Sequence, residues 1–165
     1  MKWAISTMLL IFLLIAPEVY GQEFTFQGLP WGSTREQVIT RLGQPSREAM
    51  LSILYYDGVT VAGYTASLSV LVQVRQGMRR ADYHFPNFQN SLLTLAAYSD
   101  LRQQLIIRYG QPSRARISFF EYWSKNNFHV VLGMGDQEVF ISYFPDTEWE
   151  TFLKENNIDL ESFGL

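Results

Sequence analysis

A thirteen-residue segment occurs twice in this chain, and this repeat constrains the fold more than any other feature. The run Arg-Glu-Gln-Val-Ile-Thr-Arg-Leu-Gly-Gln-Pro-Ser-Arg at 35–47 returns 67 residues later, at 102–114, as Arg-Gln-Gln-Leu-Ile-Ile-Arg-Tyr-Gly-Gln-Pro-Ser-Arg, with nine of the thirteen positions identical. Such self-similarity indicates a duplicated module. Each copy alone would have little interior, so the sequence predicts that the two copies form one composite domain.

Each copy of the segment has the features of a short helix. In the first copy we expect Ser33 at the N-cap, with Glu36 three residues later completing a capping box. Gly43 is expected to end the helix, and Pro45 prevents its continuation. The second copy has comparable residues at the equivalent positions Asp100, Gln103, Gly110 and Pro112.

Short β-rich runs follow each helix. In the first copy Asp57-Gly58 predicts a hairpin turn between strands at 51–56 and 59–64, and strict alternation predicts long strands at 64–76 and 78–85. The second copy predicts a helix at 90–98 leading into the repeated helix, strands at 117–123, 128–133 and 138–144, and a closing helix from 147 to about 156. The fold class is therefore α+β: two tandem helix-plus-antiparallel-sheet modules that share one sheet, with the helices on one face.

The N-terminal residues have the composition of a secretory signal peptide. Lys2 is followed by an unbroken apolar run from Met8 to Ala16, and Val19 and Gly21 fit the small-residue cleavage rule. The predicted organisation is a signal peptide at 1–21, a first repeat at 22–88, a second repeat with closing helix at 89–157, and a tail at 158–165.

The composition narrows the partners that we expect. No later stretch is apolar enough to span a membrane, and the absence of cysteine leaves no disulfide and no lipid anchor. The formal charge of −3 does not favour nucleic acid as a partner. Aromatic residues make up 15% of the chain, and such residues build both small cores and interaction surfaces. We expect a periplasmic or secreted protein.

The run Gly28-Leu-Pro-Trp-Gly-Ser-Thr-Arg-Glu-Gln-Val-Ile-Thr-Arg-Leu-Gly-Gln-Pro resembles the SmpA/OmlA (BamE) family of outer-membrane assembly lipoproteins. Two such modules in tandem are similar to the arrangement in β-lactamase inhibitor proteins. The resemblance implies helices packed on one face of a shared sheet and a role in binding. The lipoprotein family is acylated on a cysteine, which this chain lacks, and no inhibitory loop residue can be matched to a position here. The matching residues are caps and core positions, so they carry the fold more than the function.

Few residues in the chain indicate chemistry. His84 and His129 are the only histidines, and neither has a second ligand at metal spacing. We expect His84 to be a solvated strand residue and His129 to be partly buried with its hydrogen bonds satisfied. The chain has no cysteine nucleophile and no Gly-x-Ser-x-Gly motif. The sequence therefore predicts no catalytic residue, no cofactor and no metal site.

Four residues are candidates for a partner-binding surface. Tyr56 and Trp123 lie beside predicted turns and would form such a surface if the sheet face opposite the helices is open. Arg75 and Arg80 cluster around one hairpin, where they serve either an acidic partner or protection of a sheet edge.

The expected function is that of an exported bacterial envelope protein acting as a non-catalytic protein-binding or assembly module, with another envelope or extracellular protein as partner. The alternative is a secreted or periplasmic inhibitor of a hydrolase. A third class, an enzyme without a recognisable motif, would require a deep pocket with converging carboxylates or His84.

Overall fold

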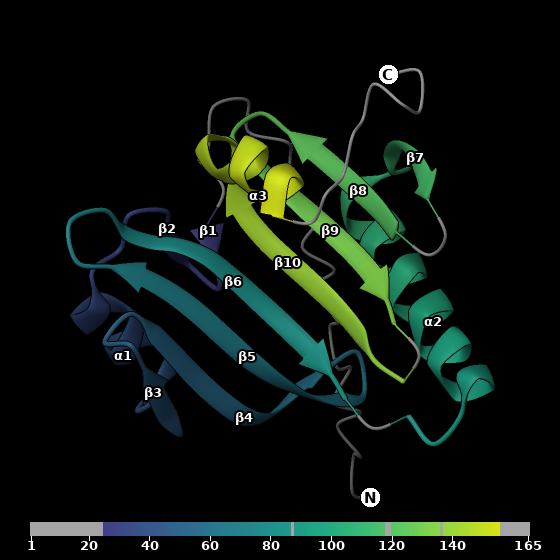
Figure 1. Cartoon of the computed structure of the whole chain (residues 1–165), viewed down its shortest axis with the longest axis horizontal. Helices are drawn as coiled ribbons and strands as arrows, with labels where there is room; N and C mark the ends of the chain where they lie inside the picture. Colours follow the sequence, from purple (N-terminus) through teal and green to yellow (C-terminus); the bar gives the residue numbers. More distant parts are fainter. Residues whose placement is uncertain (1–24, 87, 118–119, 136, 156–165) are drawn as a thin grey trace, which may run out of the picture.

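The computed structural model describes residues 25–86, 88–117, 120–135 and 137–155. Within these ranges the chain is α+β, with one large antiparallel sheet, a small hairpin and three α-helices (Figure 1). The predicted signal peptide and the tail lie outside the described residues. No helix among the described residues is long and apolar enough to cross a membrane.

The elements lie in two series along the chain, one up to residue 85 and one from residue 91. The first series is β1 (Thr25–Phe26), β2 (Leu29–Pro30), α1 (Arg35–Leu42), β3 (Arg47–Ala49), β4 (Ile53–Val61), β5 (Tyr64–Gln73) and β6 (Gly77–Phe85). The second is α2 (Ser91–Tyr109), β7 (Ser113–Ile117), β8 (Phe120–Lys125), β9 (Phe128–Met134), β10 (Val139–Pro145), the 3₁₀ turn η1 (Asp146–Glu148) and α3 (Trp149–Glu155). Eight of the strands form the large sheet in the order β3-β4-β5-β6-β10-β9-β8-β7, so the last strands of the two series pair at its centre.

The structure confirms the residues that were predicted to end the helices and corrects the predicted N-caps. Gly43 and Gly110 end α1 and α2 at positive φ, with their N–H groups donating to Ile39 and Ile106. The N-cap of α1 is Thr34 rather than Ser33, because the Ser33 hydroxyl is buried and donates to the Pro30 carbonyl oxygen at 2.7 Å.

The helix–loop–helix expected at 90–109 is one continuous helix. Asn90 caps it, and no glycine or proline interrupts the nineteen residues of α2. Asp100, which the repeat placed at a second N-cap, lies inside the helix, where its carboxylate accepts from the Tyr64 hydroxyl at 2.6 Å.

Asp57-Gly58 makes a β-bulge and not the expected hairpin turn. Tyr56 pairs with Leu68 and Val59 with Ala66, so two residues of β4 oppose one residue of β5. Gly58 has a φ of +71°, a conformation that glycine adopts at little cost in such bulges. The chain reverses later, at Ala62-Gly63, and β4 therefore runs unbroken to Val61.

The helices cover both faces of the sheet, which corrects the expectation that all lie on one face. The main core lies between the sheet and helices α1 and α2, with Val38, Leu101 and Leu105 among its buried residues. Helix α3 covers β8, β9 and β10 on the opposite face (Figure 1), where Phe152 packs with Tyr122, Val131 and Phe144 in a second cluster.

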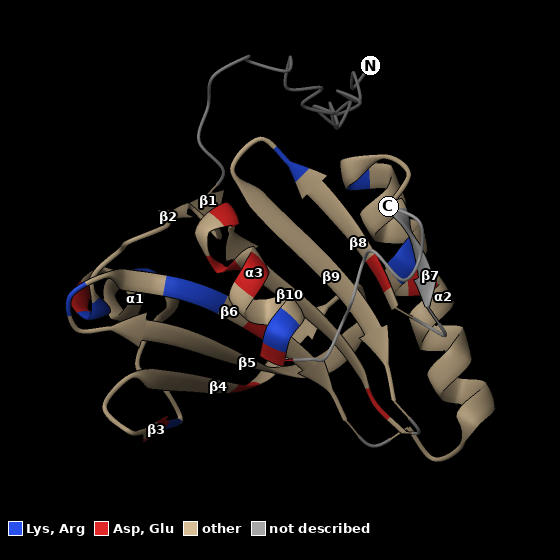
Figure 2. Ribbon diagram, turned by 45° about the horizontal axis from the view of Figure 1, so that its top comes forward, with Lys and Arg blue, Asp and Glu red and all other residues tan. Residues whose placement is uncertain are grey.

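Charged residues of β6 hold α3 in place. A bulge between β5 and β6 puts Arg79 and Arg80 beside the final helix, where Figure 2 shows blue segments of β6 next to red segments of η1 and α3. The Arg79 Nε donates to Glu148 at 2.9 Å, and the Arg80 guanidinium lies 5.2 Å from the ring centroid of Phe152. A seven-residue helix is not stable by itself, so α3 depends on these contacts.

Candidate binding surface

The turn between β3 and β4 exposes two large apolar side chains. Met50 and Leu51 both have positive φ, 51° and 56°, and the Ser52 N–H closes the turn on the Ala49 carbonyl oxygen at 3.1 Å. Two central residues at positive φ are typical of a type I′ turn, which strongly favours Asn-Gly. Left-handed backbone costs a residue with a bulky side chain about 1–2 kcal/mol. Met50 and Leu51 adopt it while 89% and 84% exposed.

The neighbouring β5–β6 hairpin ends in a third exposed apolar residue. Val74 is 93% exposed at its tip. Three backbone hydrogen bonds hold the two tips and the loop before α1 together: Val72 to Ser52 at 2.7 Å, Gly32 to Met78 at 2.9 Å and Met78 to Ser33 at 2.8 Å. Both tips therefore lie at the same end of the sheet on a fixed support.

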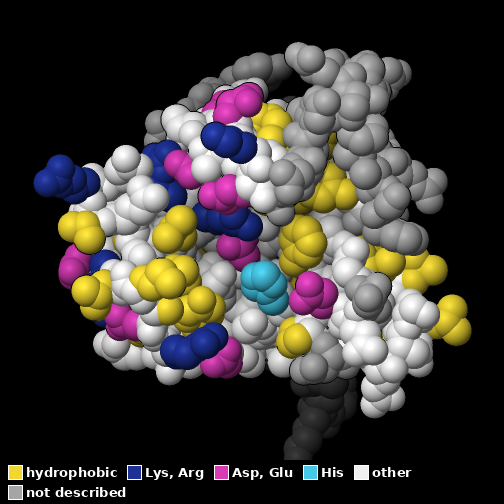
Figure 3. Space-filling model, viewed as in Figure 1, with side chains coloured by type: hydrophobic (Ala, Val, Ile, Leu, Met, Phe, Trp, Pro, Cys, Tyr) yellow, Lys and Arg dark blue, Asp and Glu magenta, His cyan; other side chains and the backbone are white. Residues whose placement is uncertain are grey.

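Two half-buried side chains extend this exposed surface onto the sheet. Ile53 and Leu71 are direct cross-strand partners, on the face that α1 does not cover. Figure 3 shows hydrophobic side chains gathered at the left-hand ends of β4 and β5. We call this surface the apolar rim, and it consists of Met50, Leu51, Ile53, Leu71 and Val74.

An open groove of about 450 Å³ lies between the apolar rim and the start of α1. Its charged lining comprises Arg35, Glu36 and Arg75, with Arg35 also paired to Glu48. Two of its lining residues, Gly77 and Gly32, pack closely, because a Cβ on Gly77 would lie 2.0 Å from the Gly32 carbonyl oxygen. The rim and groove together present an apolar surface with charged margins, as protein interfaces do.

The four residues predicted to bind a partner do not form one surface in the structure. Tyr56 and Trp123 are only 6% and 1% exposed, so the expectation that they lie on an open face is wrong. Both belong to the main core on the helix side, and the Trp123 indole donates to the Gly110 carbonyl oxygen at 2.8 Å. Arg80 pairs with Asp82 at 2.7 Å beneath α3, whereas Arg75 is exposed and lines the groove. A binding role for Arg75 stays a prediction.

The sequence did not predict the apolar rim, because an apolar residue in a short turn cannot be distinguished from the first or last residue of the adjoining strand. The sequence pattern assigns Leu51 to the strand at 51–56 and Val74 to the strand at 64–76. A weak signal exists in the alternation: Val74 and Leu71 have opposite parity, and a regular strand cannot bury both on one face.

The two histidines differ in burial, and His129 is more deeply buried than the sequence predicts. His84 is exposed on β6. The buried His129 stacks on Trp149, with ring centroids 4.3 Å apart, and its Nε2 lies 2.9 Å from Asp146. Its Nδ1 has no hydrogen-bond partner among the described residues, so the imidazole is only half satisfied. Burial, which outweighs the attraction of Asp146, lowers the pKa of His129 below its usual value.

No cluster of three or more potential metal ligands occurs among the described residues. Comparison of the chain with family models, with curated proteins and with solved structures returns no match.

Proposed function

We propose that this chain is an exported envelope protein, working in the periplasm or outside the cell, that binds another protein without catalysis. The apolar rim is its binding surface, and the signal-like start at 1–21 supports export. In this proposal the protein consists of two tandem modules, each resembling the SmpA/OmlA (BamE) family, that share one sheet.

Contacts that recur 67 residues apart support the tandem arrangement. The Ser46 hydroxyl accepts from the backbone N–H of Asp57 at 3.0 Å, and its equivalent Ser113 accepts from Ser124 at 3.2 Å. The last strands of the two halves, β6 and β10, pair antiparallel at the centre of the sheet. Duplicated modules related by an approximate two-fold axis would give this strand order.

The observation that carries the binding function is the pair Met50 and Leu51, almost fully exposed in left-handed backbone. Neither the strain nor the exposure stabilises the isolated protein. Burying a Met or Leu side chain against a partner gains about 1.5–3 kcal/mol each, which would exceed the cost of holding it in this turn. Strained backbone clusters at active sites, ligand-binding sites and switch regions.

The alternative, inhibition of a hydrolase, is favoured by the shape of the surface. The two tips project from one end of the sheet, and a projecting apolar turn can enter the cleft of an enzyme. An assembly role instead requires a partner that stays bound in the envelope.

Affinity capture from envelope extracts tests the proposal. The mature chain is compared with a Met50→Asn/Leu51→Gly variant, whose residues suit the turn but lack the apolar side chains. Leu92→Ser/Ile107→Ser is the matched control, because these residues are also exposed, at 77% and 71%, but lie on α2.

We expect one protein to be retained by the wild type and the control and lost by the turn variant. A membrane-assembly component would support the first function and a soluble hydrolase the second. Capture of the same proteins by all three forms would contradict binding through the apolar rim.

A further inference from the structure

A cavity of about 200 Å³ opens on the other face of the sheet, away from the apolar rim. It exists because the two halves are covered unequally. The nineteen-residue α2 covers the second half, whereas α1 has only eight residues and ends at Leu42, on the wall of the cavity. The small β1–β2 hairpin covers part of the remaining sheet but leaves this space open.

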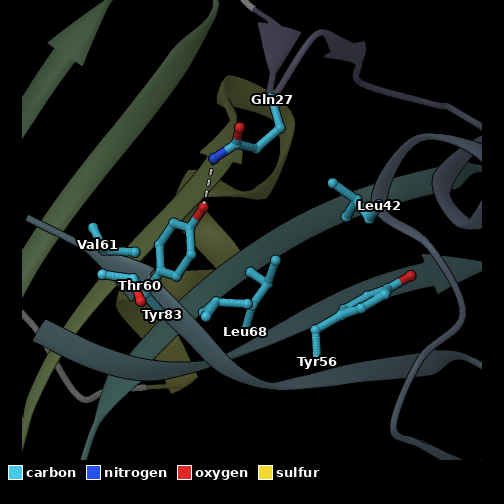
Figure 4. A pocket seen from close by; sticks show the side chains of 8 residues that line it. Gln27, Leu42, Tyr56, Thr60, Val61, Leu68 and Tyr83 are labelled. Atoms are coloured by element: carbon cyan, nitrogen blue, oxygen red, sulfur yellow. Dashed lines mark hydrogen bonds between the residues drawn. The ribbon is translucent and has the colours of Figure 1, made fainter. Parts of the chain in front are cut away.

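The wall of the cavity is mainly apolar and carries no charge. Four aliphatic side chains and two aromatic ones form most of it: Leu42, Val59, Val61, Leu68, Tyr56 and Tyr83. Gln27 and Thr60 supply the remaining polar groups, and Figure 4 shows Gln27 reaching over the cavity to the hydroxyl of Tyr83. An ion entering here would lose its hydration without gaining a counter-charge, so a neutral ligand is favoured.

The polar end of the cavity is fixed in position. Gln27 has a positive φ of 54° in the β1–β2 turn, and its carbonyl oxygen accepts from the Arg41 Nε at 2.7 Å. Its side-chain Nε2 donates to the Tyr83 hydroxyl at 2.8 Å. Because that hydroxyl accepts from Gln27, its own proton remains available to another acceptor. A tyrosine hydroxyl keeps this proton at neutral pH, and burial raises the pKa of Tyr83 further.

We propose that this cavity binds a small, neutral, mainly apolar ring compound whose single polar atom accepts a hydrogen bond from Tyr83. Cavities of about 150 Å³ with aliphatic walls take up benzene, so the available volume suits one substituted ring. This site is separate from the apolar rim and goes beyond the proposed protein-binding function.

The test is a titration of the isotope-labelled mature chain, followed by amide NMR shifts, with phenol, toluene and benzoate as probes. We expect saturable shifts with phenol and toluene, confined to the residues around the cavity, and none with benzoate, whose charge the wall cannot accommodate. Saturation with benzoate, shifts spread over other surfaces, or no saturation with phenol up to its solubility limit would each overturn the proposal.

Two variants make the test specific. Tyr83→Phe keeps the ring but removes the hydroxyl, so phenol should bind about five-fold more weakly while toluene binds unchanged. Val59→Phe fills the cavity from a half-buried position and should abolish binding of both. Equal weakening of phenol and toluene by Tyr83→Phe would contradict the assigned hydrogen bond, and binding retained in a folded Val59→Phe protein would contradict the location.

Discussion

Some single residues of this protein reduce its stability, and those of the β3–β4 turn are the clearest case. Met50 and Leu51 occupy backbone that Asn and Gly adopt with less strain. A turn that served only to join two strands would have no reason to carry them. The surrounding structure holds the strain, and the proposed partner would bind the exposed side chains.

Replacing this turn with Met50→Asn/Leu51→Gly should stabilise the isolated protein. The expected gain is about 1–2 kcal/mol in the free energy of unfolding, because left-handed strain is relieved and no buried contact is lost. Urea unfolding of the variant beside the wild type measures it. A loss of stability would show that the two side chains support the fold, and the argument for a binding turn would fail.

A second residue-scale prediction concerns the support of the β5–β6 tip. Gly77→Ala should destabilise the protein by more than about 2 kcal/mol, because it adds strain at a φ of +70° and places a Cβ against the Gly32 backbone. Gly63→Ala is the matched control, since Gly63 has a φ of +84° and no atom within 4 Å of the added Cβ. Thermal unfolding should rank Gly77→Ala well below Gly63→Ala. Equal effects would mean that the contact with Gly32 is not needed.

At the scale of elements, the sequence predicted helix α3 but not the face of the sheet that it covers. The amphipathic pattern predicted a helix from 147 to about 156, and the structure has α3 at Trp149–Glu155 after the turn η1. The prediction put α3 on the same face as the other helices. This was wrong because the alternation of apolar residues along a strand does not say which face a later helix covers. A partial signal was nonetheless present: β9 has consecutive apolar residues at Val130, Val131 and Leu132, and the strand is buried on both faces.

The attachment of α3 should weaken as the pH falls. In the folded chain His129 has a lowered pKa, so below about pH 6.5 the unfolded state binds a proton that the native state resists. The stability that depends on neutral His129 is therefore fully present above that pH. It is lost as the pH falls through the folded-state pKa of His129. Protonation would place a hydrogen on the buried Nδ1, which lacks an acceptor among the described residues.

Urea unfolding at about pH 7.5 and about pH 5 measures this effect. The wild type should lose more stability over that interval than His129→Gln, whereas the exposed His84→Gln should follow the wild type. Because the comparison is between variants, the titration of carboxylates cancels. An identical pH dependence in wild type and His129→Gln would sink the explanation.

At the scale of the whole molecule, the sequence predicted what depends on local chemistry and missed what depends on tertiary contact. The glycines at 43 and 110 predicted the helix ends correctly, because a C-cap is a property of a few adjacent residues. Asp57-Gly58 has the same local preference in a bulge and in a turn, and only pairing with β5 decides between them. Burial of Tyr56 and Trp123 likewise depends on the helices that pack over them.

The sheet that joins the two halves gives a final prediction, that they unfold together. Strands β6 and β10 pair over five residues at the centre, and Tyr83 and Tyr143 contact each other across this junction with ring centroids 6.3 Å apart. Leu54→Ala leaves a cavity in the first half and should cost about 2–5 kcal/mol, since Leu54 is 1% exposed. If the sheet is one cooperative unit, this loss also lowers the unfolding midpoint of the second half.

Tryptophan fluorescence can report that midpoint. In a Trp31→Phe background the described tryptophans that remain are Trp123 and Trp149, both in the second half. Leu132→Ala is the control, because it creates a comparable cavity in the same half as these probes. We expect both substitutions to shift the fluorescence transition together with the circular-dichroism transition. A fluorescence midpoint that Leu54→Ala leaves unmoved would mean that pairing between β6 and β10 is too weak to couple the halves, and that each half is stable by itself.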